Sequence, residues 1–593
     1  MKEFFKTLAA SFIGVSIFGV ISAVIIFSLI ASLLDFGPIG PSMPSQAVLE
    51  IDMSTIVLSE QTMEPETPIT DILEGAPIIT PMGVFSTVQA INAAAVDPAV
   101  KFIYLKPDAA MGGLAQIEEL RAALINFRQS GKAVVSYIEN PTNAGYYLAS
   151  ASDKIYMTSH DGGLNTFNGV SSQMIFLKDA LDRLGINVQL IRHGKYKSAG
   201  EMFVRSSSSK ENLEQNQAMI NSIWSSWSQE IAQERNISEE DLNEAVNSLA
   251  LNSPADFLEK GLVDELLTGE QMKQKLATLF SVSDPTKVES ISIQDYSMLL
   301  APVRNDNAKI AVIYADGEII DGSYQKEVAG DRFAELISEV RQNSAVKAVV
   351  LRVNSPGGSV LASEKIKAEL DLLKERVPVI ASFGDYAASG GYWISAGCDK
   401  IFANKTTLTG SIGVFSLIPD FKKTLSDKLH VNVTSVNSNK HSDMYGMTRP
   451  LQQSEKDYLQ ASVEQIYDKF TTIVAEGRGM RVSAVDSVGQ GRVWTGAEAL
   501  EAGLVDEIGT LEDAINFAAM HIAQTYNQTS IEVFECPRPL SSIELLMDAF
   551  GLNLEATLPC LQPFHHLENA FRDWTATQSG KVYARIPYVF SIQ

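Results

Sequence analysis

The stretch VPVIASFGDYAASGGYW, residues 377–393, contains the features that decide the fold. Val377–Phe383 is a short apolar run, as expected for a buried strand of a parallel sheet. Ser389 follows this strand, and Gly390 and Gly391 lead into a short helical pattern. A strand that passes directly into a helix is the unit from which α/β folds are built.

The residues before this stretch show the same alternation. Ile310–Tyr314 and Ala348–Val353 are predicted strands, and Phe333–Arg341 between them has helical spacing. A second predicted helix places three apolar side chains on one face: Ile366, Leu370 and Leu373. Strand, helix, strand and helix in this order predict an α/β fold with parallel sheets.

The pattern occurs twice in the chain. Subtracting 246 from the residue numbers maps Ala387–Trp393 onto Pro141–Tyr147 and Val346–Leu351 onto Val100–Leu105. Gly503–Glu507 repeats Gly261–Glu265 at a shift of 242. Matches in the same order at nearly constant shift indicate a tandem repeat. We predict two homologous domains, residues 46–295 and 306–530, separated by a linker at 296–305 and followed by a tail at 531–593.

The N-terminus predicts a membrane anchor. No charged residue occurs from Leu8 to Leu34, and about 20 helical residues suffice to cross a bilayer. A cleaved signal peptide has a shorter apolar core of roughly 7–15 residues. Residues 1–35 are therefore predicted to form a cytoplasmic N-terminus and a single transmembrane helix, with a linker at 36–45. Lys2 and Lys6 before the helix predict that the rest of the chain lies outside the cytoplasm.

Composition excludes several classes of function. The formal net charge is −24, which disfavours binding to nucleic acid, because phosphates require basic surfaces. The three cysteines, Cys398, Cys536 and Cys560, are too few and too scattered for a disulfide framework or a cysteine metal site. We expect Cys398 to be buried as a small apolar side chain. The sequence allows a bridge between Cys536 and Cys560 but does not require one.

Two segments have features of an acyl-transfer site. Ser389 lies between a strand and a helix, where backbone N–H groups favour developing negative charge. The Asn354–Ser359 segment contains Gly357 and Gly358, whose N–H groups can form an oxyanion hole worth about 10²–10³ in rate. Each segment is equally compatible with an ordinary strand-to-helix turn. Neither one alone establishes catalysis.

The general base is harder to find. Seven histidines are present, and none lies in a segment with catalytic features: His160, His193, His430, His441, His521, His565 and His566. A lysine can replace histidine where burial lowers its pKa. Lys197 lies in the segment Tyr196–Ala199 among small and uncharged neighbours, although a solvated surface lysine fits the same residues.

These residues together resemble the signal peptide peptidase A family, also called protease IV, in its long tandem form. Four motifs carry the resemblance: Asn354–Gly358, Ala388–Tyr392, Thr409–Gly413 and Tyr196–Ala199. Any one of them is unspecific, but their combination with an N-terminal anchor and two related domains covers nearly the whole chain.

The resemblance implies a serine protease with Ser389 as nucleophile and Lys197 as general base. It implies that Gly358, with Gly357 or Gly390, supplies the oxyanion donors and that Ser411 holds the lysine by a hydrogen bond. It further implies ClpP/crotonase-like α/β domains, homotetramers and no metal or other cofactor. The substrates would be peptides, in particular signal peptide remnants, on the periplasmic side of the bacterial inner membrane.

The repeat provides a check within the chain. The position equivalent to Ser389 in the first copy is Asn143, which cannot act as a serine nucleophile. A looser alignment maps Lys197 onto Ser442 of the second copy. Each copy therefore keeps the residue that the other lacks. This pattern predicts one composite active site between the two domains.

Two other functions remain as alternatives. A crotonase-like acyl-CoA enzyme would also use an oxyanion glycine pair, but it needs no serine nucleophile. A non-catalytic membrane quality-control scaffold would tolerate a degenerate first copy, but it would not need Ser389, Lys197 and the glycine segment together. Failure of a serine-directed probe to label Ser389 would favour one of these alternatives.

Overall fold

The computed structural model describes residues 41–63, 79–301, 303–324, 327–538 and 583–585. The predicted anchor, Cys560 and most of the predicted tail lie outside the described residues. Within the described ranges, no helix has the length and apolar character needed to span a bilayer.

The first half of the chain forms a parallel sheet of six strands in the order β8-β6-β5-β4-β1-β9. Every neighbouring pair in this sheet is parallel. The strands are β1 (Ala47–Asp52), β4 (Val100–Lys106), β5 (Val134–Ile138), β6 (Lys154–Thr158), β8 (Glu265–Leu267) and β9 (Ser290–Ser292). Alternate side chains of these strands enter two separate hydrophobic cores, so helices must cover both faces.

The second half forms a larger sheet in the order β19-β17-β15-β13-β10-β21, with β16 and β20 attached beside β15. Its strands are parallel except for the β17–β19 pair. The strands are β10 (Lys309–Asp316), β13 (Val346–Ser355), β15 (Val379–Ala388), β16 (Lys400–Ala403), β17 (Leu408–Gly410), β19 (Val493–Thr495), β20 (Glu507–Ile508) and β21 (Glu532–Cys536). The prediction of an α/β fold with parallel sheets is therefore confirmed.

The predicted elements around Ser389 are also confirmed. Two of the three predicted strands lie within β10 and β13, and the third, Val377–Phe383, overlaps β15, which begins two residues later at Val379. The helices between them are α13 (Gly330–Gln342) and α14 (Val360–Lys374). Ile366, Leu370 and Leu373 are buried on one face of α14, as predicted. The glycine segment differs from expectation, because Gly357–Ser359 forms a short strand, β14, rather than a simple loop.

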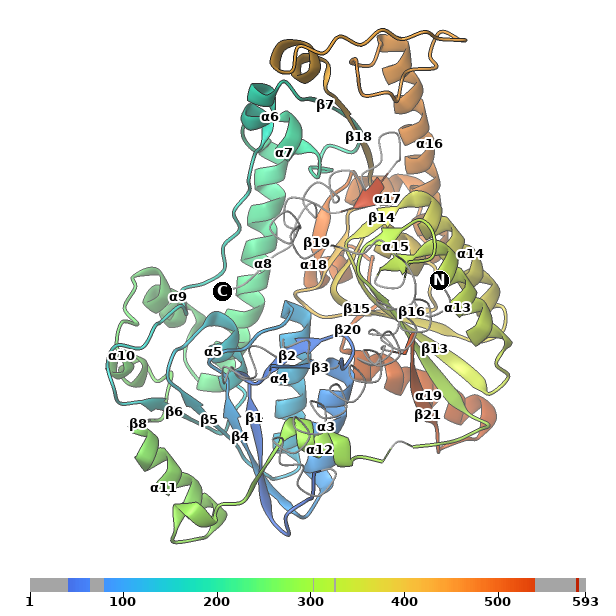
Figure 1. The fold of residues 1–593 in the computed structure, drawn as a ribbon. Coiled ribbons are helices and arrows are strands. Elements are labelled where there is room, and N and C mark those ends of the chain that lie inside the picture. The colour runs from blue at the N-terminus through green and yellow to red at the C-terminus, as the bar shows by residue number, and fades with distance from the viewer. Residues whose placement is uncertain (1–40, 64–78, 302, 325–326, 539–582, 586–593) are drawn as a thin grey trace, which may run out of the picture.

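A third sheet joins the two halves. Its order is β12-β11-β14-β22-β18-β7, and it contains β7 (Asn187–His193) from the first half. The other strands are β11 (Ile319–Ile320), β12 (Val328–Ala329), β18 (Val414–Asp420) and β22 (Tyr583–Arg585). β7 pairs antiparallel with β18 over its whole length, from Asn187 opposite Asp420 to His193 opposite Val414. Figure 1 shows these two strands together at the top of the molecule.

Helices surround these sheets. The longest helices of the described ranges are α8 (Lys210–Arg235) and α16 (Gln453–Arg478), and α16 packs against both β7 and β18. The other described elements of the first half are β2 (Ile56–Ser59), β3 (Thr80–Gly83), α3 (Val84–Val96), α4 (Leu114–Gln129), α5 (Asn143–Ala149), α6 (Lys178–Leu184), α7 (Glu201–Val204), α9 (Glu239–Asn247), α10 (Pro254–Glu259), α11 (Gly269–Phe280), the short 3-10 helix η1 (Pro285–Lys287) and α12 (Ile293–Leu299). Those of the second half are α15 (Gly390–Ser395), the short π-helix η2 (Thr424–Lys428), α17 (Val482–Val488), α18 (Gly496–Glu501) and α19 (Leu511–Tyr526).

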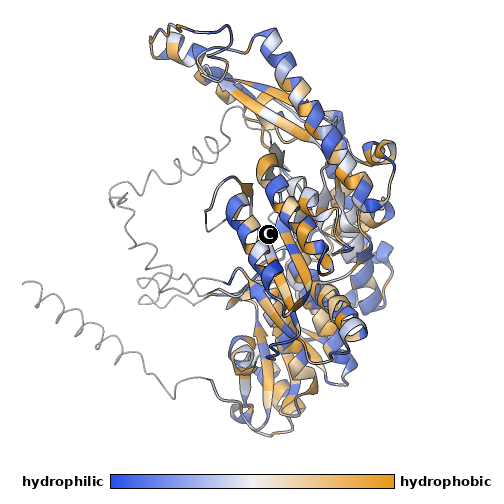
Figure 2. Cartoon of the chain, turned by 90° about the vertical axis from the view of Figure 1, so that its right-hand side faces the viewer, coloured by the Kyte–Doolittle hydropathy of each residue, from blue (hydrophilic) through white to orange (hydrophobic). Residues whose placement is uncertain are grey.

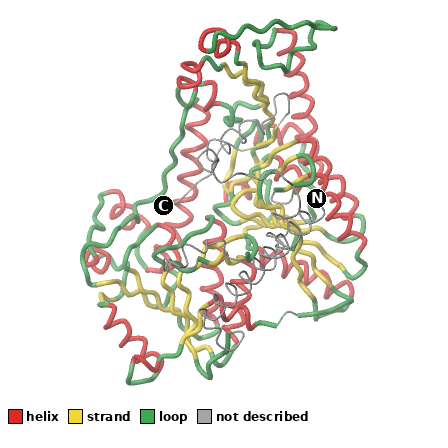
Figure 3. Tube along the Cα trace, viewed as in Figure 1, coloured by secondary structure: helices red, strands yellow, loops and turns green. Residues whose placement is uncertain are grey.

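Hydropathy follows this layered arrangement. Figure 2 shows mostly apolar strands, while the long helices alternate between apolar and polar residues. Figure 3 shows the strands gathered inside each half, with helices and loops outside them. Burial of one helix face against an apolar sheet supplies the main driving force for this arrangement.

A buried ion-pair network also connects the halves. The Arg352 guanidinium on β13 donates to Glu60 Oε2 at 2.6 Å and to Glu119 Oε1 at 2.8 Å. Glu60 and Glu119 belong to the first half, and all three side chains are buried. Asn404 and the backbone N–H of Leu511 also donate to Glu119. The carboxylates are thus fully engaged, which fixes α4 against the second sheet.

Candidate active site

Ser389 lies where β15 passes into α15. It adopts φ +56° and ψ −111°, in a region that residues other than glycine rarely occupy. Its N–H donates to Gly410 O at 2.8 Å, and its carbonyl accepts from Trp393 N at 2.8 Å. The surrounding structure thus holds the serine in a strained backbone conformation. Such strain, of order 1–3 kcal/mol, is found mostly at functional sites.

Lys197 reaches Ser389 from the other half of the chain. Its Nζ lies 2.8 Å from Ser389 Oγ, 2.9 Å from Ser411 Oγ and 3.1 Å from Ser411 O. All three residues are buried, with Lys197 only 1% exposed. The structure therefore brings together, within one chain, the nucleophile, the base and the lysine-positioning residue that were predicted from the sequence.

Burial determines the charge state of this lysine. Desolvation holds the pKa of Lys197 well below its usual value of 10.5. None of the described carboxylates forms an ion pair with its amine, so no negative charge offsets the desolvation. The amine is therefore shifted toward its neutral form, which has a lone pair available to accept a proton.

The backbone of Lys197 is held by the second half. Tyr196 N donates to Gln490 O at 2.9 Å. Gly491 packs directly against Lys197, and a Cβ on Gly491 would lie 2.7 Å from Lys197 Cα. Arg192, at the end of β7, donates from Nη1 to Lys197 O at 2.8 Å. The β7–β18 pairing and these contacts together place the lysine of one half beside the serine of the other.

The predicted oxyanion glycines lie next to the nucleophile. Gly358 has φ +155° and is so tightly packed that a Cβ there would lie 2.0 Å from Ile319 O. A Cβ on Gly390 would lie 3.1 Å from Gly358 N, so the two predicted donors are neighbours. The N–H of Gly357, in contrast, already donates to Ser355 Oγ at 3.2 Å. This arrangement favours Gly358 and Gly390 over Gly357 as donors.

The equivalent position in the first half has a different role. Asn143 is buried, and its side-chain amide exchanges two 3.0 Å hydrogen bonds with the backbone N–H and C=O of Gly169. The amide thus anchors a loop. Ser442, the position that the repeat matches to Lys197, is exposed and caps a turn through Asn439 O at 2.9 Å.

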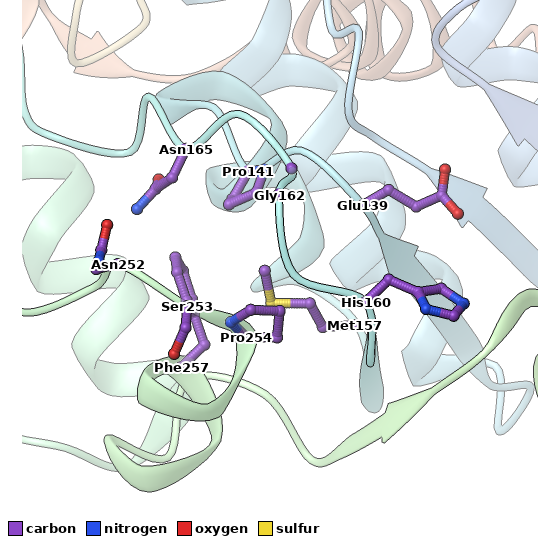
Figure 4. A pocket seen from close by; sticks show the side chains of 11 residues that line it. Glu139, Pro141, Met157, His160, Gly162, Asn165, Asn252, Ser253, Pro254 and Phe257 are labelled. Carbon is purple, nitrogen blue, oxygen red and sulfur yellow. The ribbon is translucent and has the colours of Figure 1, made fainter.

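The described histidines do not take the place of the lysine beside Ser389. His193 stacks on Tyr467 at 3.9 Å, His441 contacts Glu455, and His160 lines a small pocket in the first half. None of the histidines in the described ranges hydrogen-bonds to Ser389. Figure 4 shows that the pocket is formed by first-half residues such as Glu139, Asn165 and Asn252. It contains none of the predicted site residues.

Sequence reasoning missed several residues that build the site. Gly491 and the Arg352 network act across the two halves, at separations along the chain that no local pattern reveals, whereas Arg192 holds Lys197 O from only five residues away. Gly491 was only weakly predictable, because glycine often occurs where two backbone segments approach closely but nothing in the sequence identifies the second segment. The prediction that Cys398 is a buried side chain is confirmed. Cys536 is buried, and Cys560, with which the sequence allows a bridge, lies outside the described residues.

Comparison with known proteins identifies relatives over most of the chain. "Protease 4" of Haemophilus influenzae is 35% identical over 476 residues, which cover 78% of this chain and 76% of that protein. "Serine protease SPPA, chloroplastic" of Arabidopsis thaliana is 31% identical over 467 residues, covering 77% and 68%. "Putative signal peptide peptidase SppA" of Enterococcus faecium is 37% identical over 216 residues, covering 35% and 62%.

The family model of "Peptidase family S49" matches the chain twice, at residues 126–283 and 371–525. One match falls in each copy of the repeat, and the second includes Ser389. Together with the relatives that match more than three quarters of the chain, these matches show that the chain is a tandem member of peptidase family S49, a family of serine proteases.

Proposed function

We propose that this protein is a membrane-anchored serine endopeptidase that uses a Ser389–Lys197 dyad to degrade cleaved signal peptides and similar apolar peptides. The observation that carries the proposal is the buried 2.8 Å contact between Lys197 Nζ and Ser389 Oγ. Family membership supports proteolysis over the acyl-CoA enzyme and the scaffold, because the relatives are named as proteases.

The hydrogen-bonding capacity of a neutral amine explains how the lysine acts as a base. Such an amine has two N–H donors and one lone pair. Ser411 O can only accept, so it takes one N–H, and Ser411 Oγ takes the second because its own hydroxyl can donate to Gly491 O at 3.5 Å. The lone pair of Lys197 then faces the hydroxyl proton of Ser389.

The reaction follows from this arrangement. Lys197 accepts the Ser389 proton as Oγ attacks the peptide carbonyl, and the N–H groups of Gly358 and Gly390 stabilise the oxyanion. The lysine then donates this proton to the leaving amine, which leaves an acyl-enzyme. Water, deprotonated by the same lysine, hydrolyses the ester and regenerates Ser389. In this scheme Ser389 is the nucleophile, Lys197 is the base, and Gly358 and Gly390 are the oxyanion donors.

Further parts of the proposal follow from the family resemblance. The two domains are ClpP/crotonase-like, and the chain assembles as a homotetramer. Residues 1–35 anchor it in the bacterial inner membrane, with residues 46–295 and 306–530 on the periplasmic side. The substrate binds as an extended strand at a sheet edge, with alternate side chains in apolar pockets.

The test uses full-length protein in detergent micelles with an apolar, signal-peptide-like peptide as substrate. Mass spectrometry should detect internal cleavage by the wild type and none by Ser389→Ala. Fractionation of cells should place the wild type with membranes and release a chain that lacks residues 1–35. Cleavage by Ser389→Ala at the wild-type rate would refute the proposed nucleophile, and a soluble full-length protein would refute the anchor.

A further inference from the structure

A strand from near the end of the chain lies in the active site. β22 pairs antiparallel with β14, with Arg585 opposite Gly357, Ala584 opposite Gly358 and Tyr583 opposite Ser359. On its other side β22 pairs antiparallel with β18, where Tyr583 lies opposite Phe415. It also contacts α15, the helix that begins after Ser389. Figure 1 shows it as the short red arrow beside β14.

This position is the one that a peptide substrate would need. A peptide that adds a strand to a sheet gains its affinity from main-chain hydrogen bonds, and its side chains provide specificity. β14 contains the oxyanion glycine Gly358, and β18 begins three residues after Ser411. A strand between β14 and β18 therefore lies beside Gly358 on one side and beside the strand that follows Ser411 on the other. β22 therefore occupies the site in the manner of a substrate.

One side chain of this strand makes an ionic contact. Arg585 Nη1 lies 3.3 Å from Glu318 Oε1 and 3.2 Å from Glu318 Oε2. Both side chains are partly exposed, at 38% for Arg585 and 28% for Glu318. Glu318 precedes β11, which pairs with β14 through Ile319 and Gly358. We call the position between β14 and β18, which β22 occupies, the slot. The Glu318 carboxylate lies at the rim of this slot, one strand away from the strand bound in it.

The backbone of Glu318 is fixed at this rim. Its N–H donates to Glu327 Oε2 at 2.8 Å, and its carbonyl accepts from Val328 N at 3.1 Å. The adjacent Glu327 carboxylate adds a second negative charge. A fixed acidic rim of this kind favours a cationic side chain over a neutral or anionic one.

We propose that Glu318 is a specificity-determining residue that selects a basic side chain on the bound peptide, and that the chain's own Tyr583–Arg585 strand occupies this slot as an internal competitor. The inference rests on the proposed protease function and deepens it. It adds a preference for a basic side chain to a site that is otherwise expected to accept apolar peptides. It also requires that β22 leave the slot before a peptide substrate can bind and be cleaved.

The first test measures specificity. Full-length protein in detergent is given a series of fluorogenic apolar peptides in which Arg, Gln or Glu is placed at each position in turn. The wild type should prefer Arg over Gln at one position by about two- to fivefold in kcat/KM, as expected for a partly exposed ion pair. Glu318→Gln should lose this preference, and Glu318→Lys should prefer Glu. Glu335→Gln, an exposed site on α13, is the matched control and should retain the wild-type pattern.

The second test measures competition by the chain itself. Arg585→Glu should raise kcat/KM for a neutral apolar peptide about two- to fivefold, because repulsion from Glu318 weakens the β22 strand. Adding Glu318→Lys to this variant restores the ion pair with reversed charges and should bring activity back toward the wild type. Unchanged activity in Arg585→Glu, or a peptide preference that survives Glu318→Lys, would overturn the inference.

The two proposals fail in different ways. If wild-type protein cleaves no peptide and a fluorophosphonate probe does not label Ser389, the protease function itself is wrong. If Ser389 is labelled and peptides are cleaved, but no position shows a charge preference that responds to residue 318, only the role of Glu318 is wrong.

Discussion

At the scale of single residues, the site combines two features that oppose folding. The backbone of Ser389 has a positive φ, and the amine of Lys197 is buried beside hydroxyl and carbonyl groups without a carboxylate partner in the described structure. Burial of an ammonium ion is costly, so the protein lowers the pKa of the lysine and loses the charge instead. The result is a buried amine that is shifted toward its neutral form, which can accept a proton.

The pH dependence of activity should reveal this lysine. The protonated amine has no lone pair, so kcat/KM should rise with pH through the pKa of Lys197. Because burial lowers that pKa, the acidic limb should lie well below 10.5. The measurement is kcat/KM between pH 5 and pH 11. A limb close to 10.5 would contradict the assignment. Lys197→Arg, whose guanidinium stays protonated, should be inactive throughout the range.

Ser411 should act through the lysine rather than on the substrate. Ser411→Ala removes the 2.9 Å contact with Lys197 Nζ, so the amine is held less well. We expect kcat to fall on the order of 10-fold to 10²-fold with little change in KM. Ser150→Ala is a matched control, because Ser150 is also buried and its hydroxyl donates to Tyr147 O at 2.7 Å far along the chain from the site. Equal effects of the two substitutions would indicate a merely structural role for Ser411.

At the scale of elements, the ends of strands determine where the chemistry occurs. β15 delivers Ser389, β17 leads to Ser411, β7 leads to Lys197, and β14 carries Gly358. The relative position of these strands depends on contacts between the halves, and the buried Arg352 network is one of these contacts. It links β13 to α4 and to the residue after β2.

Breaking this network should destabilise the protein strongly. Arg352→Ala leaves Glu60 and Glu119 buried without their cation, at an expected cost of about 3–5 kcal/mol. Arg341→Ala breaks the more exposed pair with Glu369 and should cost about 1 kcal/mol or less. Denaturant unfolding of both variants measures the difference. A cost for Arg352→Ala no larger than that for Arg341→Ala would show that the network does not hold the halves together.

At the scale of the whole molecule, two related halves have become one enzyme. The third sheet takes β7 from the first half and β14 and β18 from the second. Gly358 lies in this sheet and Lys197 follows its strand β7, while Ser389 lies at the end of β15 in the second sheet. Asn143 and Ser442 now have structural roles at the positions that the missing serine and lysine would occupy. Neither half therefore contains a complete dyad.

Much of this organisation could be predicted from the sequence. The apolar runs around β10, β13 and β15 are continuous because both faces of a parallel sheet are buried, so their pattern was clear. The complementary loss of serine and lysine indicated a composite site. The β7–β18 pairing, the Arg352 network and the insertion of β22 could not be predicted. They depend on contacts between segments hundreds of residues apart, and their side chains carry no local periodicity.

The central claim is that Lys197 of the first half activates Ser389 of the second. The most direct measurement is fluorophosphonate labelling of the full-length protein in detergent, with wild type, Lys197→Ala and Ser389→Ala compared at equal folded concentration. The account predicts labelling of the wild type at Ser389 and none of Ser389→Ala. It also predicts that Lys197→Ala reacts at least about 10²-fold more slowly, as expected for loss of a general base. Labelling of Lys197→Ala at the wild-type rate would contradict the account.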